Sequence, residues 1–317
     1  MSRRRSMAAR VKAYLLYRRG LGYQLKIEGQ LLGQFAEFAD QSGHRGPVTT
    51  ELALRWARST SGTERLYWAR RLEVVRCLAR HLAPMEPGTE IPLRGLLGPA
   101  HRRTTPYIYS DAEIAGLMTS ARRLHPTDGL RPRTYETLIG LLAAAGLRIS
   151  EALHLARGHV DWDRGWLCVR QTKFRKTRWV PLHPTATAAL RAYAELRDRT
   201  FPHCDPDRFF VNDRGLPLPY STIRTVFRGL CNGLRIAGSR RRPRLHDLRH
   251  TFACRRIELW SEAGMDVTHA ITALSTYLGH AKVTDTYWYL TATPDLMARA
   301  AAQFERFDAL THGEGQS

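Results

Sequence analysis

The most distinctive stretch of this chain runs Leu-His-Asp-Leu-Arg-His at 245–250, Leu-Gly-His at 278–280 and Thr-Tyr-Trp-Tyr-Leu at 286–290. His246 and Arg249 are three residues apart, so on a helix they point to one face about a turn apart. Tyr289 follows His280 by nine residues. Two histidines, an arginine and a tyrosine therefore occur in a fixed order, which indicates a site assembled from the C-terminal part of the chain.

These residue types suit chemistry on a phosphodiester. A guanidinium binds two phosphate oxygens at once, and an imidazole exchanges a proton near neutral pH. A phenol is a poor nucleophile at neutral pH unless neighbouring groups draw off its proton or stabilise its anion. The set is therefore an inventory for attacking a phosphodiester without metal.

The same spaced residues resemble the C-terminal signature of the tyrosine recombinases, the phage-integrase family. The run Gly-Leu-Arg-Ile-Ser-Glu at 146–151 closely resembles the family's first-arginine motif and points to Arg148. We expect an apolar helix to stop at Gly146 and a new helix to begin near Ser150, which fixes the direction of Arg148. Glu151 is expected to orient its neighbours. The alternative is that Arg148 and Glu151 form only a helix-end salt bridge.

Alternating residues predict a β-hairpin with Trp166–Arg170 and Arg178–Leu182 as its strands. Lys173 and Lys176 fall at its tip, where a lysine is usually solvated surface. The resemblance implies a lysine in this turn near the leaving oxygen, and counting back from Val180-Pro181-Leu182 selects Lys173. The turn departs from the family pattern, because Thr-Lys-Phe replaces Gly-Lys-Gly.

The resemblance also implies a role for each site residue. Arg148 and Arg249 would hold the scissile phosphate and neutralise its transition-state charge. Lys173 would protonate the leaving oxygen, His246 would act as acid–base partner, and His280 would bind the phosphate or support the site. Neither a metal nor ATP is implied, because a covalent link to the enzyme conserves the energy of the broken bond.

Tyr289 is the expected nucleophile, which would leave a 3′-phosphotyrosyl link and a free 5′-hydroxyl. Tyr287 is its rival. On a helix the two side chains lie about 200° apart, so one would face the site and the other would pack away from it. The spacing from His280 selects Tyr289.

The charge of the chain indicates a polyanionic partner. Its 49 Lys+Arg residues outnumber 29 Asp+Glu, which gives a formal net charge of +20, and nucleic acid is the default partner for such a protein. Only five of the basic residues are lysine, so coding bias contributes. A cluster of arginines lies immediately before the His246 helix: Arg240, Arg241, Arg242 and Arg244. We interpret these arginines, and separately Lys176, as contacts to the phosphate backbone.

The cysteine spacing and the hydropathy of the sequence indicate the cellular compartment. The five cysteines form no pair with the spacing of a zinc site or a disulfide framework, which favours a reducing cytoplasm. The N-terminus lacks the apolar run of a signal peptide, and the longest apolar stretch, 138–147, is too short to span a membrane. We therefore expect a soluble, cytoplasmic, nucleoid-associated protein.

The chain is expected to form two domains. Residues 7–83 show helical spacings, and a capping box of Ser61 with Glu64 is expected to open the fourth helix. The arginines of this segment are expected on a basic exterior. Between 84 and 106 five prolines predict a linker. Ser110 with Glu113 forms a second capping box. The prediction is therefore a helical domain at 1–104 and a catalytic domain at 105–317.

The predicted fold class is mainly α with a small antiparallel β-sheet, and the resemblance implies a C-shaped clamp around duplex DNA with an N-terminal core-binding domain. Strand exchange between two duplexes needs four protomers. The closing run 285–294 resembles recombinases of bacterial transposable elements that act with sister recombinases. A last helix from Pro294 could pack in cis or on a neighbouring protomer. Two other functions stay open, an inactive DNA-binding regulator and a type IB topoisomerase-like enzyme.

Overall fold

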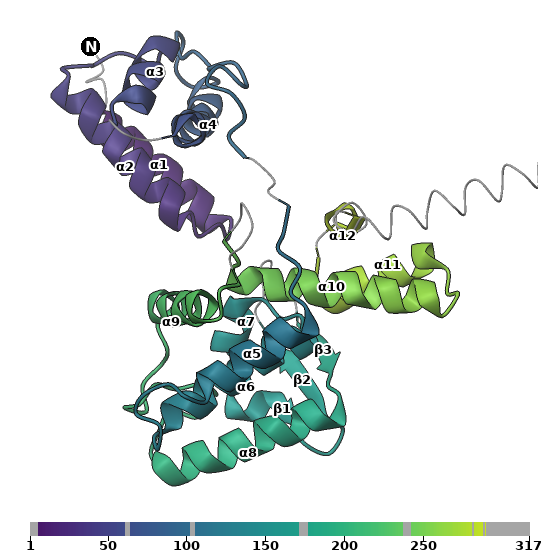
Figure 1. The fold of residues 1–317 in the computed structure, drawn as a ribbon. Helices are drawn as coiled ribbons and strands as arrows, with labels where there is room; N and C mark the ends of the chain where they lie inside the picture. The colour runs from purple at the N-terminus through teal and green to yellow at the C-terminus, as the bar shows by residue number, and fades with distance from the viewer. Residues whose placement is uncertain are drawn as a thin grey trace, which may run out of the picture. The chain divides into compact units, whose positions relative to one another are not determined.

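The computed structural model describes residues 6–60, 64–101, 105–170, 177–236, 242–280, 282–287 and 289. The chain divides into two compact units, Met1–Thr104 and Thr105–Ser317. Both units are mainly helical, and the second contains a three-stranded antiparallel sheet (Figure 1). The predicted fold class is confirmed in these respects. The predicted C-terminal helix from Pro294 lies outside the described residues.

The first unit packs four helices around one apolar core. The most deeply buried side chains include Phe35, Trp56, Val75 and Leu78. The helix that was expected to open at Ser61 begins at Arg65, with Glu64 at its N-cap position, and Ser61 lies outside the described residues. The helices are α1 (Met7–Gly20), α2 (Lys26–Gln41), α3 (Thr50–Arg58) and α4 (Arg65–Leu82).

Arg71 departs from the basic exterior expected for α4, because its side chain is buried. Its guanidinium carbon lies 4.0 Å from the ring centroid of Trp56, and the group donates to Thr60 and Ser59. A cation over an indole face keeps a favourable electrostatic partner after losing water. Arg71 therefore stabilises the packing of α4 on α3.

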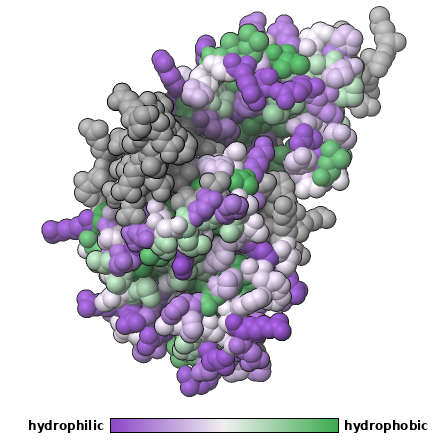
Figure 2. All heavy atoms as spheres, turned by 90° about the vertical axis from the view of Figure 1, so that its right-hand side faces the viewer, coloured by the Kyte–Doolittle hydropathy of each residue, from purple (hydrophilic) through white to green (hydrophobic). Residues whose placement is uncertain are grey.

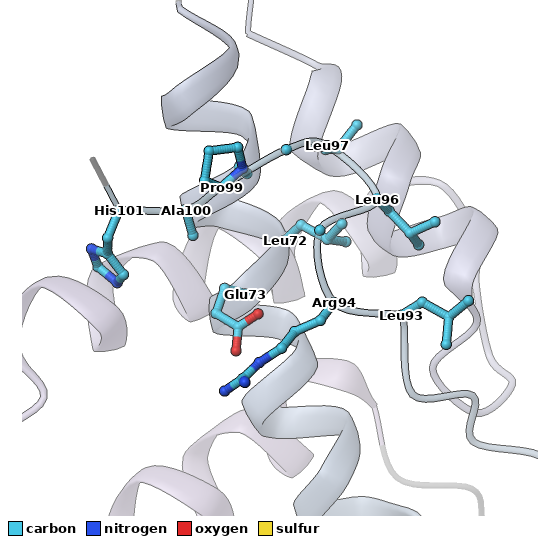
Figure 3. Close-up of a pocket in the computed structure, with 12 residues that line it drawn as sticks. Leu72, Glu73, Leu93, Arg94, Leu96, Leu97, Pro99, Ala100 and His101 are labelled. Atoms are coloured by element: carbon cyan, nitrogen blue, oxygen red, sulfur yellow. The ribbon is translucent and has the colours of Figure 1, made fainter. Parts of the chain in front are cut away.

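The proline-rich segment after α4 folds back along its own unit. Pro92 accepts a hydrogen bond from Arg76 Nε at 2.9 Å, and the carboxylate of Glu90 accepts one from the backbone N–H of Thr50 at 2.8 Å. Leu97 packs against the core of the unit. Between this segment and α4 lies a hollow of about 490 Å³ (Figure 3), lined by residues 69, 72, 73 and 93–101.

The second unit places its sheet beside a group of helices. Strands β1 (Val160–Asp161), β2 (Trp166–Val169) and β3 (Arg178–Pro181) pair antiparallel in the order β1-β2-β3, which confirms the predicted hairpin strands. Its helices are α5 (Asp111–Ala121), α6 (Leu130–Ala145), α7 (Ile149–Leu153), the 3-10 turn η1 (Arg157–His159), α8 (Pro184–Thr200), α9 (Tyr220–Gly233), α10 (Leu245–Glu262), α11 (Val267–Leu278) and α12 (Thr284–Tyr287).

Two apolar clusters organise this unit. The larger one surrounds α6, with Leu138 and Ile139 almost completely buried. The smaller one joins the second half of α10 to α11 and contains Phe252, Ile257 and Leu278. Because α10 contributes to both, it fixes the smaller cluster to the main body (Figure 1). The predicted capping box of Ser110 with Glu113 is present at the start of α5.

The visible face of the molecule is largely hydrophilic, with apolar side chains scattered among charged ones (Figure 2). This agrees with a sequence in which a quarter of the residues are charged. Among the described residues, no helix combines the length and the apolar character that crossing a bilayer requires.

Candidate active site

The direction of Arg148 is set by a helix stop. Helix α6 ends at Ala145, and Gly146 follows with φ of +59°, a conformation that side chains rarely adopt. A Cβ at Gly146 would also clash with the ring of Phe252. Arg148 then occupies the N-cap position of α7, and its backbone N–H donates to Glu151 Oε2 at 3.0 Å. The predicted stop and restart of the helix are confirmed.

Glu151 is the centre of the site. Arg148 Nη1 donates to its Oε1 at 2.7 Å, and Arg178 donates to both of its oxygens at 3.1 and 2.8 Å. Arg249 Nη1 lies 4.0 Å from Oε2. Burial alone would raise the pKa of Glu151, but the hydrogen bonds and charges of Arg178 and Arg148 outweigh it and lower the pKa to about 2. The carboxylate is therefore ionised at neutral pH.

The C-terminal end of α11 receives all three arginines. Of the carbonyl oxygens of residues 277–279, the first accepts from Arg178 at 2.7 Å, the second from Arg249 at 2.7 Å and the third from Arg148 at 3.1 Å. Carbonyls at a helix C-terminus lack partners within the helix and carry partial negative charge, which favours cations. This end of α11 leads directly to His280.

Arg249 is the most deeply buried of these cations. Its side chain is 1% exposed, and its Nη1 donates to the Gly146 carbonyl at 2.8 Å. Burial and the charge of Arg148 lower the pKa of Arg249 to about 10, so it stays protonated at neutral pH. A buried cation with donors left to share is suited to binding an anion that enters the site.

Tyr289 is buried next to Arg249 in the smaller apolar cluster, with only 2% of its surface exposed. Its ring centroid lies 5.4 Å from that of His250 and 6.0 Å from that of His280. Burial raises the pKa of Tyr289, while the charge of Arg249 and a hydrogen bond with it act in the opposite direction. Arg249 is thus placed to stabilise the phenolate that an attack requires.

Tyr287 lies apart from this arrangement, since 43% of its surface is exposed. Helix α12 ends at Tyr287, so Tyr289 does not follow it as one continuous helix. The expected separation of the two side chains is nevertheless present, because Tyr289 is buried while Tyr287 is exposed. The inward tyrosine is the one that the spacing from His280 selected.

Three imidazoles surround the tyrosine and the arginines. His280 Nδ1 lies 2.7 Å from Thr286 Oγ1, which fixes its ring. The ring centroid of His246 lies 4.8 Å from that of His250. Burial and nearby positive charges, chiefly Arg249, lower the pKa of both His246 and His280 to about 4. Both rings are therefore neutral at pH 7 and able to accept a proton.

His250 is a site neighbour that the sequence argument did not single out. Burial, with the neighbouring His246 and two arginines, lowers its pKa to about 3, and its Nδ1 is buried without a hydrogen-bond partner in the described part of the chain. Arg178 and Thr286 were also missed as site residues. The spacing of His250, four residues after His246 on one helix face, was a usable signal; Arg178 offered only a place in a strand.

The structure brings Arg148, His246, His280 and Tyr289 together around Arg249. Lys173, Lys176, Arg240 and Arg241 lie outside the described residues. Arg242 and Arg244 are both exposed, and Arg244 also occupies the N-cap position of α10 and donates to Asp247 at 2.7 Å. The proposed phosphate contacts in this cluster remain predictions.

A buried tyrosine beside buried, protonated arginines is the set of groups that an enzyme attacking a phosphate ester through a tyrosine would need. The model of the phage integrase family matches residues 110–295. "Putative integrase/recombinase y4rB" of Sinorhizobium fredii is 41% identical over 307 residues, which cover 93% of this chain and 96% of that protein. The tyrosine recombinase XerD of Chlorobaculum tepidum is 28% identical over 229 residues, 72% of this chain and 71% of that one.

A solved structure of the Tn1549 transposon integrase, in complex with transposon right-end DNA, has a similar fold. Its TM-score is 0.68 at 17% identity, and the match covers 96% of this chain and 100% of that one. This protein belongs to the phage integrase family, and it is a tyrosine-type site-specific recombinase.

Proposed function

We propose that this protein cleaves and rejoins double-stranded DNA at specific sites through a 3′-phosphotyrosyl intermediate on Tyr289. The observation that carries this proposal is the meeting of a buried tyrosine with Arg249, which itself shares Glu151 with Arg148. A nucleophile, two phosphate-binding cations and neutral imidazoles within one site are the parts that a transesterification needs.

In the proposed reaction, Arg148 and Arg249 exchange backbone carbonyls for the oxygens of the scissile phosphate. The phenolic oxygen of Tyr289 bonds to phosphorus, and the bond from phosphorus to the 5′-oxygen breaks. His246 accepts the phenolic proton, His280 supports the phosphate, and Lys173 protonates the leaving 5′-oxygen. The 5′-hydroxyl of a partner strand then reverses these steps, and the covalent link conserves the bond energy.

The partners follow from this chemistry. The net charge of +20 and the exposed Arg242 favour duplex DNA, which the N-terminal unit would help to hold as a core-binding domain in a clamp. Exchange between two duplexes requires four active sites, so we propose a tetramer on DNA. A mobile element is the proposed genetic context, with sister recombinases as further partners, and the DNA substrate implies a cytoplasmic, nucleoid-associated location.

Covalent trapping tests the proposal. Duplexes from the DNA that flanks this gene, nicked beside candidate cleavage positions, are incubated with the protein in EDTA and run on a denaturing gel. We expect an adduct that Tyr289→Phe abolishes and that Tyr287→Phe retains, since Tyr287 is exposed. Loss only with Tyr287→Phe would identify the other tyrosine as the nucleophile.

Two further outcomes separate the alternative functions. If no adduct forms on DNA that the protein demonstrably binds, the chain is an inactive DNA-binding protein. If an adduct forms and supercoils relax but strands never exchange, the enzyme acts as a topoisomerase. Recombinant joints between two labelled duplexes are the product expected of the wild-type chain.

A further inference from the structure

Arg178, the first residue of β3, uses all three guanidinium nitrogens. Nη1 and Nη2 donate to the two oxygens of Glu151 at 3.1 and 2.8 Å, and Nε donates to the Tyr277 carbonyl at 2.7 Å. The side chain is 12% exposed. A fork-to-fork pair with a carboxylate fixes the orientation of both groups, so Arg178 joins the sheet, α7 and the end of α11.

This pair determines how Glu151 shares its charge. Arg178 makes two hydrogen bonds to it, and the side chain and backbone N–H of Arg148 make two more. A carboxylate accepts about four hydrogen bonds, so Glu151 is fully occupied, and Arg249 stays at 4.0 Å. Three guanidinium groups around one carboxylate leave two net positive charges. These charges can stabilise an incoming phosphodiester and its more negative transition state.

Arg178 also anchors the segment that leads to His280. Gly279 adopts φ of +67°, and a Cβ there would lie 2.9 Å from Arg178 Nη1, so the guanidinium passes where only glycine leaves room. Arg148 and Arg249 hold the neighbouring carbonyls. Phosphate would compete for these two cations, because an anionic phosphate attracts a guanidinium group more strongly than a neutral carbonyl does and can accept two of its hydrogen bonds at once. Arg178, paired with Glu151, would keep its bond to α11.

We propose that Arg178 is a positioning residue, which holds Glu151 and the C-terminal end of α11 in place while Arg148 and Arg249 turn to the scissile phosphate. This inference rests on the proposed function. It predicts that loss of Arg178 slows cleavage far more than it weakens DNA binding, because the residue acts through the alignment of other groups.

The first test measures single-turnover cleavage of nicked duplex and DNA affinity for Arg178→Ala, Arg178→Gln and Arg178→Lys. We expect Arg178→Ala to cleave ~10- to 100-fold more slowly, as expected for a small misplacement of reacting groups, with Kd nearly unchanged. Arg178→Lys should recover only part of the rate, since an ammonium cannot bind both oxygens in a fork. Added guanidinium ion should restore Arg178→Ala more than an equal concentration of sodium ion.

A matched control is Arg133→Ala, which removes an arginine from the other arginine–glutamate cluster of the unit, at Glu136. It should cleave like the wild type. If Arg178→Ala, shown to be folded by its circular dichroism melt, also cleaves at the wild-type rate, the proposal is wrong. Arg178→Gln, which is closer in size, provides the same comparison if Arg178→Ala does not fold.

A double variant asks whether Arg178 acts through Glu151. Groups that share one ion-pair network do not have additive effects. In a Glu151→Gln background, Arg178→Ala should therefore cost less than ~3-fold in cleavage rate, because the group that it orients has lost its charge. Fully additive losses would show that Arg178 acts independently of Glu151 and would overturn the inference.

Hydrogen exchange gives a readout that does not need cleavage. In the full-length protein, Arg178→Ala should speed amide exchange in peptides that cover the end of α11, while Arg133→Ala leaves it unchanged. Unchanged exchange in Arg178→Ala would refute the positioning role even if the wild-type chain formed no adduct. Faster exchange with an inactive wild type would refute only the proposed function.

Discussion

Two arginine–glutamate clusters lie in the described part of the second unit, and they differ in what surrounds them. At Glu136, Arg122 and Arg133 each contribute an ion pair, at 2.6 and 3.1 Å, and their side chains are more than half exposed. At Glu151, Arg148 and Arg178 form pairs of 2.7 and 2.8 Å, and their side chains are 26% and 12% exposed. Similar contacts therefore occur in two dielectric environments.

The difference in exposure between the two clusters indicates which of them can bind and stabilise an anion. Glu136 itself is buried, but water screens the exposed guanidinium groups of its partners, which limits the contribution of these pairs to stability. Around Glu151, burial removes that screening, and the arginines take carbonyls of another helix as additional partners. Buried cations that are only partly neutralised create a strong field for an anion. Burial and neighbouring groups therefore make the Glu151 cluster suited to binding an anion. The ion pairs alone do not distinguish it from the Glu136 cluster.

The largest expected effect concerns conservative changes of one arginine in each region. Arg249→Lys should slow single-turnover cleavage of nicked duplex by ~100- to 1,000-fold, because a buried forked donor aimed at the phosphate is lost. Arg133→Lys should leave the rate unchanged, since its exposed pair with Glu136 contacts no group of the site. Equal rates for the two variants would remove the distinction between the clusters.

Glu151 should contribute to the stability of the protein in a pH-dependent way. The pKa of Glu151 is lowered from 4.5 to about 2, so its stabilising effect is complete above pH 4.5 and is lost as the pH falls towards 2. A shift of this size corresponds to about 3 kcal/mol. Glu151→Gln should therefore unfold at lower urea concentration at pH 7 and approach the wild type at acidic pH.

The control for this comparison is Glu136→Gln, which should cost less stability at pH 7 than Glu151→Gln, because the two arginines paired with Glu136 are more than half exposed. The measurement is urea unfolding at several pH values, followed by tryptophan fluorescence. If Glu151→Gln lost the same stability at every pH, its role would be packing, and the ion pairs with Arg148 and Arg178 would contribute little.

Local sequence signals predicted much of this fold. The stop at Gly146, the capping box at Ser110 and the strand alternation around Trp166 depend on residues within a few positions of one another, and all three appear in the structure. The pair of Arg148 with Glu151 is of the same kind, because the two residues are three apart. Short-range geometry is fixed by backbone conformation, which residue types report directly.

The parts of the site that sequence did not predict depend on distant partners. Arg178 meets Glu151 across 27 residues and the Tyr277 carbonyl across 99. A backbone carbonyl has no sequence signature, so no pattern of residue types indicates that the end of α11 receives three arginines. Arg71 shows the same limit in the first unit, where contact with Trp56 rather than its own helix decides its burial.

The variant with the smallest expected effect changes the backbone next to the Glu151 cluster, at Gly146. It tests whether the position of this backbone matters as much as that of the side chains. Gly146→Ala places a methyl group against Phe252 at φ of +59°, which should destabilise the unit by ~2 kcal/mol. Because the Gly146 carbonyl accepts from Arg249 at 2.8 Å, cleavage should also slow, by roughly 10-fold.

The control is Gly229→Ala, in α9, where no atom lies within 4 Å of the added Cβ. It should instead stabilise the helix by ~0.5–1 kcal/mol and leave the cleavage rate unchanged. Thermal melts and single-turnover cleavage assays measure the stability and the cleavage rate of both variants. If Gly146→Ala is destabilised yet cleaves at the wild-type rate, Arg249 does not depend on this carbonyl for its alignment.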